Sequence, residues 1–195
     1  METLGALVAF AFVSSVTPGP NNILLWASGA EFGFRRTIRH VVGTALGIGA
    51  MAVGVAAGLG LLVAAVPGLA LAMKVAGSAY LLVLAYQVAG ARALVRGDLA
   101  RPLGLGQAAA FQLINPKAWI FALGAITTFR PASLPVAAGS GLVAVTMMLV
   151  VVPTAALWAL AGGAISRLLA GGRSDRAVSL VLALLLAATV VLVWI

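Results

Sequence analysis

Residues 14–22 read Ser-Ser-Val-Thr-Pro-Gly-Pro-Asn-Asn and interrupt an apolar stretch that continues on both sides. Proline has no amide hydrogen and its ring clashes with the carbonyl four residues earlier, so two prolines this close end a regular helix. We expect Pro18 to leave the Ser14 carbonyl without a donor, and Pro20 to do the same to Val16. In a bilayer, such carbonyls are tolerated only where they line protein or a water-filled cavity. The stretch therefore predicts a broken membrane helix beside a cavity.

Composition places the whole chain in a membrane. Of its 195 residues, 63% are hydrophobic and 8% are charged, whereas a soluble domain carries roughly 25% charged residues. The first apolar run has no basic residues before it and is too long for a signal peptide, so it is expected to be the first membrane helix. A helix needs about 20 apolar residues to cross a bilayer. We expect an all-α integral membrane protein with six transmembrane helices, at about 4–27, 38–65, 69–91, 107–129, 134–163 and 176–195.

The cations predict how the helices are oriented. The net charge is +8, and nine of the 12 cations lie in alternate polar breaks between the predicted helices. Cytoplasmic loops are enriched in Lys and Arg, so these breaks are predicted to be cytoplasmic and both termini to lie outside. This distribution explains the basic charge without a nucleic-acid partner. The nine are Arg35, Arg36 and Arg39 in the first break, Arg92, Arg96 and Arg101 in the third, and Arg167, Arg173 and Arg176 in the fifth.

A second proline break lies near the middle of the chain, where residues 112–117 read Gln-Leu-Ile-Asn-Pro-Lys. Pro116 is expected to free the Gln112 carbonyl. Pro18 and Pro116 are 98 residues apart, half of the 195-residue chain. Either proline alone could be a packing kink, but interrupted helices at matching places in two halves are the best sequence indication of a transporter's binding site.

The chain is therefore predicted to be a single transporter domain, 1–195, built from pseudo-repeats 1–98 and 99–195. Each half would have three helices, and an odd number inserts the two halves with opposite topology. The first and fourth helices, which contain the breaks, would correspond to each other.

Two lysines lie within predicted helices. Lys117 is near the middle of its segment, where a charge costs at least ~2.5–3.5 kcal/mol on insertion scales, so we expect it to face a cavity. Lys74 is close to the start of its helix, where a functional role and snorkelling to the interface both remain open. No acidic residue occupies a helix centre. A substrate carboxylate could pair with a lysine, while the freed carbonyls, Asn21 and Asn22 accept hydrogen bonds from its ammonium group.

Few side chains are available for other chemistry. The chain has one histidine and no cysteine, which argues against an enzyme and against a divalent metal site. An ion or metal exporter on this scaffold and a non-transporting membrane scaffold protein remain as alternatives. Glu31, His40 or a lysine could couple transport to protons, although His40 is expected at the membrane interface. Small residues four apart, as in Gly43-x-x-x-Gly47 and Gly54-x-x-x-Gly58, predict close helix packing, either within one protomer or in a homodimer.

The motif Thr17-Pro18-Gly19-Pro20-Asn21-Asn22 resembles the signature of the LysE/RhtB superfamily of amino-acid exporters. The resemblance covers nearly the whole chain. Within the superfamily, residues 18–24 and 181–186 most resemble the cysteine/O-acetylserine exporter branch. Three further motifs agree in order and spacing: Gly33-Phe34-Arg35-Arg36, Lys74-x-x-Gly77-x-x-Tyr80-Leu81 and Asn115-Pro116-Lys117.

The resemblance implies a secondary transporter of the bacterial inner membrane, with an amino-acid substrate, no cofactor and no metal. It would export neutral amino acids, cysteine or O-acetylserine by alternating access, as its two halves rearrange around the breaks, coupled to the proton gradient. Many family members carry Asp where this chain has Asn21, so a coupling role of that Asp does not transfer directly. The predicted substrate-binding residues are Thr17, Pro18, Gly19, Pro20, Asn21, Asn22, Lys74, Tyr80, Gln112, Asn115, Pro116, Lys117 and Trp119.

Overall fold

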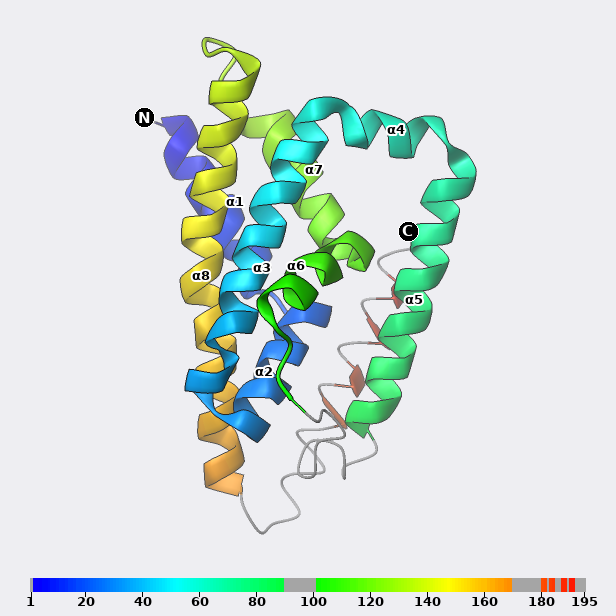
Figure 1. Cartoon of the computed structure of the whole chain (residues 1–195), viewed down its shortest axis with the longest axis vertical. Coiled ribbons are helices and arrows are strands. Elements are labelled where there is room, and N and C mark those ends of the chain that lie inside the picture. Colours follow the sequence, from blue (N-terminus) through cyan, green and yellow to red (C-terminus); the bar gives the residue numbers. More distant parts are fainter. Residues whose placement is uncertain are drawn as a thin grey trace.

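The computed structural model describes residues 2–89 and 101–169, together with residues 180, 181, 183, 184, 187, 188, 190 and 191. Within these residues every regular element is a helix (Figure 1). The elements are α1 (Glu2–Val16), α2 (Pro20–Phe32), α3 (Phe34–Gly54), the π-helical turn Val55–Leu59, α4 (Gly60–Ala65), α5 (Pro67–Ala89), α6 (Leu105–Ile114), α7 (Pro116–Phe129) and α8 (Val136–Leu169).

The helices are long and apolar enough to cross a membrane. In the described part of the chain, Phe34–Leu59 and Val136–Ile165 each meet this condition alone. Two bent pairs meet it jointly: α1 with α2, at an angle of 61°, and α6 with α7, at 80°. The all-helical membrane architecture and both predicted breaks are thus confirmed, whereas the last predicted helix, 176–195, lies largely outside the described residues.

The second predicted helix, 38–65, is wrong at both ends. It begins earlier, at Phe34, because one residue is enough to separate it from α2. This residue is Gly33, whose φ of 76° lies in a region that favours glycine. It also ends earlier, because Gly58 adopts φ 105° and breaks the helical path. The chain then turns, and α4 crosses the top of the molecule toward α5 (Figure 1). The fifth predicted helix, 134–163, extends to Leu169, and it passes through Pro153 without ending.

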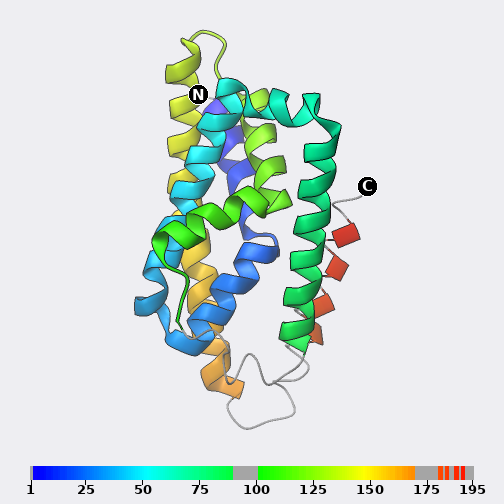
Figure 2. The ribbon, with the colours of Figure 1, turned by 45° about the vertical axis from the view of Figure 1, so that its right-hand side comes forward.

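The long helix α8 lies along one side of the molecule and contacts α1, α2 and α3. A buried apolar core fills these contacts and includes Leu25, Val143 and Met147. A second cluster joins α2 and α6 to Ala85 of α5 and to Ala183. In Figure 2 the residues near 183 run beside α5.

Glycines set the closest helix contacts. A methyl group on Gly43 would overlap the Leu105 carbonyl, and one on Gly47 would lie 2.7 Å from the Ala109 carbonyl oxygen. The predicted close packing of this pair is therefore confirmed, and its partner is α6 of the same protomer. The expectation for Gly54 and Gly58 is wrong: Gly54 faces Leu59 of its own segment, and Gly58 has open space and serves as the bend.

The tightest contact of all joins α2 to α8. A Cβ atom on Gly29 would overlap the carbonyl of Ala159, and one on Gly162 would overlap the carbonyl of Trp26. The two backbones therefore touch without side chains between them, which is possible only for residues without a Cβ.

Substitution of Gly162 tests this contact. Gly162→Ala should lower the thermal unfolding midpoint of the detergent-solubilised protein, because the added methyl group forces the helices apart. Overpacking of this kind costs about 1–3 kcal/mol, or roughly 2–12 °C in Tm. Gly141→Ala on the same helix is the matched control, since its Cβ meets nothing within 4 Å, and its Tm should stay the same or rise. Equal effects of the two substitutions would contradict the contact.

Candidate functional site

The first break separates α1 from α2 in the middle of the molecule. Pro20 occupies the first turn of α2, where its missing amide hydrogen is harmless. Gly19 before it is fully extended. The expectation of an unpaired Ser14 carbonyl is wrong, because the Thr17 hydroxyl donates to it at 3.1 Å. Asn22 secures the rest of the turn: its amide nitrogen donates to the carbonyls of Ser15 and Thr17, at 2.8 Å in each case.

The second break has the same design. Asn115 leaves the helix with φ −87° and ψ 104°, and Pro116 begins α7. The Gln112 carbonyl, predicted to be free, accepts the Asn115 amide at 3.2 Å, because the chain bends after Ile114. The Trp119 indole donates to the Leu113 carbonyl at 2.9 Å. Every one of these bonds stays within the break, so the bend is stabilised locally.

Lys117 joins the second break to the first. Its ammonium nitrogen lies 2.6 Å from the Thr17 carbonyl, 2.8 Å from the Thr17 hydroxyl and 3.2 Å from the Pro18 carbonyl. These three acceptors match the three hydrogens of an ammonium group. Gly19 makes room for the contact, because a Cβ there would lie 2.7 Å from Lys117 Cδ. The charge near the middle of the fourth predicted helix is thus held by the other break, 100 residues away in sequence.

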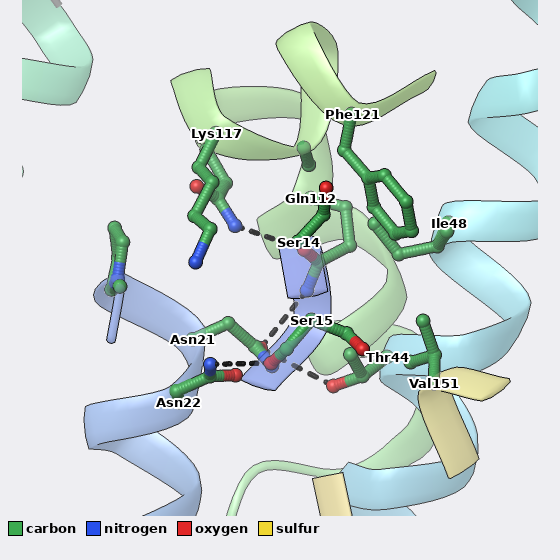
Figure 3. Close-up of a pocket in the computed structure, with 14 residues that line it drawn as sticks. Ser14, Ser15, Asn21, Asn22, Thr44, Ile48, Gln112, Lys117, Phe121 and Val151 are labelled. Carbon is green, nitrogen blue, oxygen red and sulfur yellow. Dashed lines mark hydrogen bonds between the residues drawn. The ribbon is translucent and has the colours of Figure 1, made fainter. Parts of the chain in front are cut away.

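A buried polar network runs beside this contact (Figure 3). The Asn21 side-chain oxygen accepts hydrogen bonds from Gln112 at 3.0 Å and from Thr44 at 3.2 Å, and it lies 3.4 Å from His40 Nε2. Gln112 in turn accepts from the Asn115 side chain at 3.1 Å. The network therefore connects both breaks to α3 through neutral groups.

His40 is fully buried between the helices, so its side chain faces neither lipid nor solvent. The reason is that α3 begins six residues before it, at Phe34, and its second turn faces α2 rather than solvent. Its Nδ1 atom has no hydrogen-bond partner within the described residues, and neither has the side-chain oxygen of Asn115. Buried polar atoms are rarely left unpaired, so both are points at which a water or a ligand atom can bind.

A hollow of about 380 Å³, part of it open to the outside, lies between the two breaks. Only about 40 Å³ of it is accessible to the centre of a water molecule, which is room for a few waters, so the hollow has to widen before it can hold a larger ligand. Its walls carry the polar groups of the two breaks and of Thr44, and they are apolar where Ile48, Phe121 and Val151 lie. It is lined by Ser14, Ser15, Gly19, Pro20, Asn21, Asn22, Thr44, Ile48, Gln112, Asn115, Lys117, Ala118, Phe121 and Val151.

Most of the predicted site residues meet at this hollow. Thr17, Pro18 and Pro116 shape the breaks around it, and Trp119 packs against the apolar core instead. Lys74 has an exposed side chain on α5 and is not part of the lining, and the side chain of Tyr80 lies outside the described residues. Gly77 of the same motif marks where α5 crosses the second break, because a Cβ atom there would lie 3.1 Å from the Ile114 carbonyl oxygen.

Sequence reasoning named His40 only as a candidate for proton coupling, and it missed Thr44 and Phe121. A signal did exist for His40 and Thr44, because they are four residues apart and so share one face of α3. Nothing in the sequence pairs that face with Asn21. Among the described residues, no group of three His, Cys, Asp or Glu side chains could hold a metal ion.

Known proteins resemble this chain over almost its full length. The cysteine/O-acetylserine efflux protein of Escherichia coli K12 is 33% identical over 187 residues, which cover 94% of this chain and 93% of that protein. Proteins of the same name from Shigella flexneri and from Escherichia coli O1:K1 are 33% and 32% identical with the same coverage. No solved structure shows a significant match. The profile of the family described as LysE type translocator matches residues 12–194, and the chain therefore belongs to the LysE family.

Proposed function

We propose that this chain exports small neutral amino acids or their derivatives, of the cysteine or O-acetylserine type, from the bacterial cytoplasm. Family membership makes it a membrane translocator and not an enzyme, as its composition predicts. The names of its relatives support the substrate class. The observation that carries the proposal is the bond between the breaks, in which Lys117 donates to Thr17 and Pro18 beside a small polar hollow.

Substrate binding is proposed to proceed by an exchange of partners at this bond. The ammonium of Lys117 has three neutral acceptors and no carboxylate among the described residues near it. A substrate carboxylate is a stronger partner, because its full negative charge attracts the ammonium group, whereas the carbonyl and hydroxyl oxygens carry only partial charges. Once Lys117 turns to the carboxylate, the carbonyls of Thr17 and Pro18 become available to the substrate's ammonium group. The site would thus bind both charged groups of a zwitterionic substrate.

Alternating access follows from the same exchange. In the observed arrangement Lys117 holds the two breaks together, and a substrate between them would separate them. We infer six spans in two inverted halves, with α5 and residues 176–195 as the remaining spans. Both termini would lie outside. The two bent pairs, of similar length and at matching places in the chain, support this plan.

His40 is the proposed site of proton coupling. Family members that carry Asp at position 21 have a titratable group there, whereas Asn21 cannot ionise. The titratable side chain in contact with Asn21 is His40, and its Nδ1 is free to accept a proton. A proton on Nδ1 would make both ring nitrogens donors and place a positive charge in the network beside the hollow. The titratable groups on the elements packed against it are Arg35, Arg36 and Arg39 of α3, Glu31 of α2 and Lys117 of α7, with Arg130 directly after α7, while α6 and residues 136–165 of α8 contribute none.

Loss of the Lys117 charge tests the transport proposal. Lys117→Met keeps most of the side-chain volume but cannot bind a carboxylate. Cells that express it should release cysteine or O-acetylserine at least about tenfold more slowly than wild type, since hydrogen bonds to charged groups contribute about 1.5–3 kcal/mol each. Release into the medium is measured after loading the cells with amino acids, at equal protein in the membrane.

Thr127→Ala is the control, because Thr127 lies exposed on the same helix and bonds only to the Leu123 carbonyl. Its export should match wild type. Normal export by Lys117→Met would remove the lysine from the site. If wild type exports no amino acid faster than cells without it, the substrate class is wrong.

Proton coupling is tested in proteoliposomes with a radiolabelled substrate. His40→Gln retains a donor toward Asn21 but cannot titrate. It should still exchange labelled for unlabelled substrate across the membrane, while an imposed pH gradient should no longer accelerate net transport. Glu31→Gln, at an exposed position, should respond to the gradient as wild type does. If instead Glu31→Gln lost the response to the gradient and His40→Gln kept it, Glu31 would be the coupling site.

A further inference from the structure

Four arginines from two distant parts of the chain line one hollow at the cytoplasmic end predicted by the distribution of charges. Arg35, Arg36 and Arg39 lie in the first two turns of α3, and Arg101 lies just before α6. The hollow has about 900 Å³ of empty space, part of it open to the outside, and among the described residues no acidic side chain lines it. The other polar side chain in its wall is Gln107.

The positive-inside rule accounts for cations at this face but not for their convergence. Topology requires a number of positive charges near the helix ends, and it does not require charges separated by more than 60 residues to share one hollow. Each of the four side chains is exposed and so remains free to bind. Like charges held together in this way repel one another unless an anion lies between them.

The start of α6 adds to the positive field. Gln107 accepts the Gly104 amide at 3.0 Å, which fixes the first turn of a 10-residue helix at the wall of the hollow. The partial positive charge of a helix N-terminus favours an anion there. Arginine contributes planar, paired donors that match phosphate oxygens.

We propose that this hollow binds the phosphate headgroup of an anionic phospholipid from the inner leaflet. Its position argues for a lipid, because the arginines stand at the first turns of the membrane span Phe34–Leu59, at headgroup depth. Pro102 and Leu103 give the same hollow an apolar side against which acyl chains can lie. Basic pockets between helices on the cytoplasmic side are known to bind such headgroups. A zwitterionic amino acid, with no net charge, is a poor match for four cations.

A bound lipid would bridge α3 and α6 at their cytoplasmic ends. These are the two helices that carry His40, Thr44 and Gln112 into the polar network. The lipid would thus stabilise the arrangement of α3 and α6 around the hollow between the breaks. The site is defined by binding, so it can be tested without any measurement of transport.

The test is lipid retention by the purified full-length chain. Protein is equilibrated in nanodiscs that contain equal amounts of phosphatidylglycerol and phosphatidylcholine, released, and examined by native mass spectrometry. Wild type should retain phosphatidylglycerol in preference to phosphatidylcholine. Arg39→Gln/Arg101→Gln should lose at least about five-sixths of that retention, while Arg35 and Arg36 remain to direct insertion. The control is Arg130→Gln, which removes a cation far from the hollow.

The outcomes separate the possible ligands. Equal retention of both lipids by wild type, or unchanged phosphatidylglycerol on the double variant, would overturn the proposal. Displacement of the lipid by millimolar inorganic phosphate would also overturn it, in favour of a soluble phosphate ligand. Should the double variant fail to fold, a titration of wild type decides: phosphatidylglycerol, and not phosphatidylcholine, must raise its Tm. A negative result in any of these lipid measurements does not affect the export proposal, because that proposal rests on Lys117.

Discussion

A backbone that leaves its helix inside a bilayer exposes amides and carbonyls that lipid cannot bind, and each such group must find a partner within the protein or in a water-filled cavity. This constraint shapes both breaks. Asn22 and Thr17 bond the carbonyls around the first break, and Trp119 and the Asn115 amide do the same at the second. Lys117 of the second break adds hydrogen bonds to the carbonyls of the first, and so connects the two breaks.

The breaks themselves could be predicted because proline excludes the helix for a local reason that needs no knowledge of the fold. The partners of the freed groups could not. Whether a Thr hydroxyl or an Asn amide reaches a given carbonyl depends on the bend angle, which differs between the pairs, 61° and 80°. The contact between Lys117 and Thr17 also requires a glycine at position 19 and a fold that brings residues 100 positions apart together.

The helix α3 shows a second limit of sequence reasoning. Three arginines at its start indicate a polar loop when only charge is considered, and this reading places His40 at the interface. Helices can carry charges on an exposed face while the opposite face is buried, and α3 does so from Phe34 onward: Arg36 and Arg39 are exposed while Thr37 and His40 are fully buried. The charged neighbours of a residue in the sequence therefore do not show whether its own side chain is exposed or buried.

The close approach of α2 and α8, at which Gly29 meets Ala159 and Gly162 meets Trp26, restricts how the protein can move. It joins α2, in the first half of the chain, to α8, in the second, with backbone directly against backbone. Helices in such contact cannot slide or rotate past each other without steric overlap, so α2 and α8 form one rigid body that spans both halves. In the proposed alternating access, the two halves of the chain would then not be the units of motion. The movement would fall instead to α1, α6 and α7, the half-helices outside this contact, while the α2–α8 pair serves as a fixed frame.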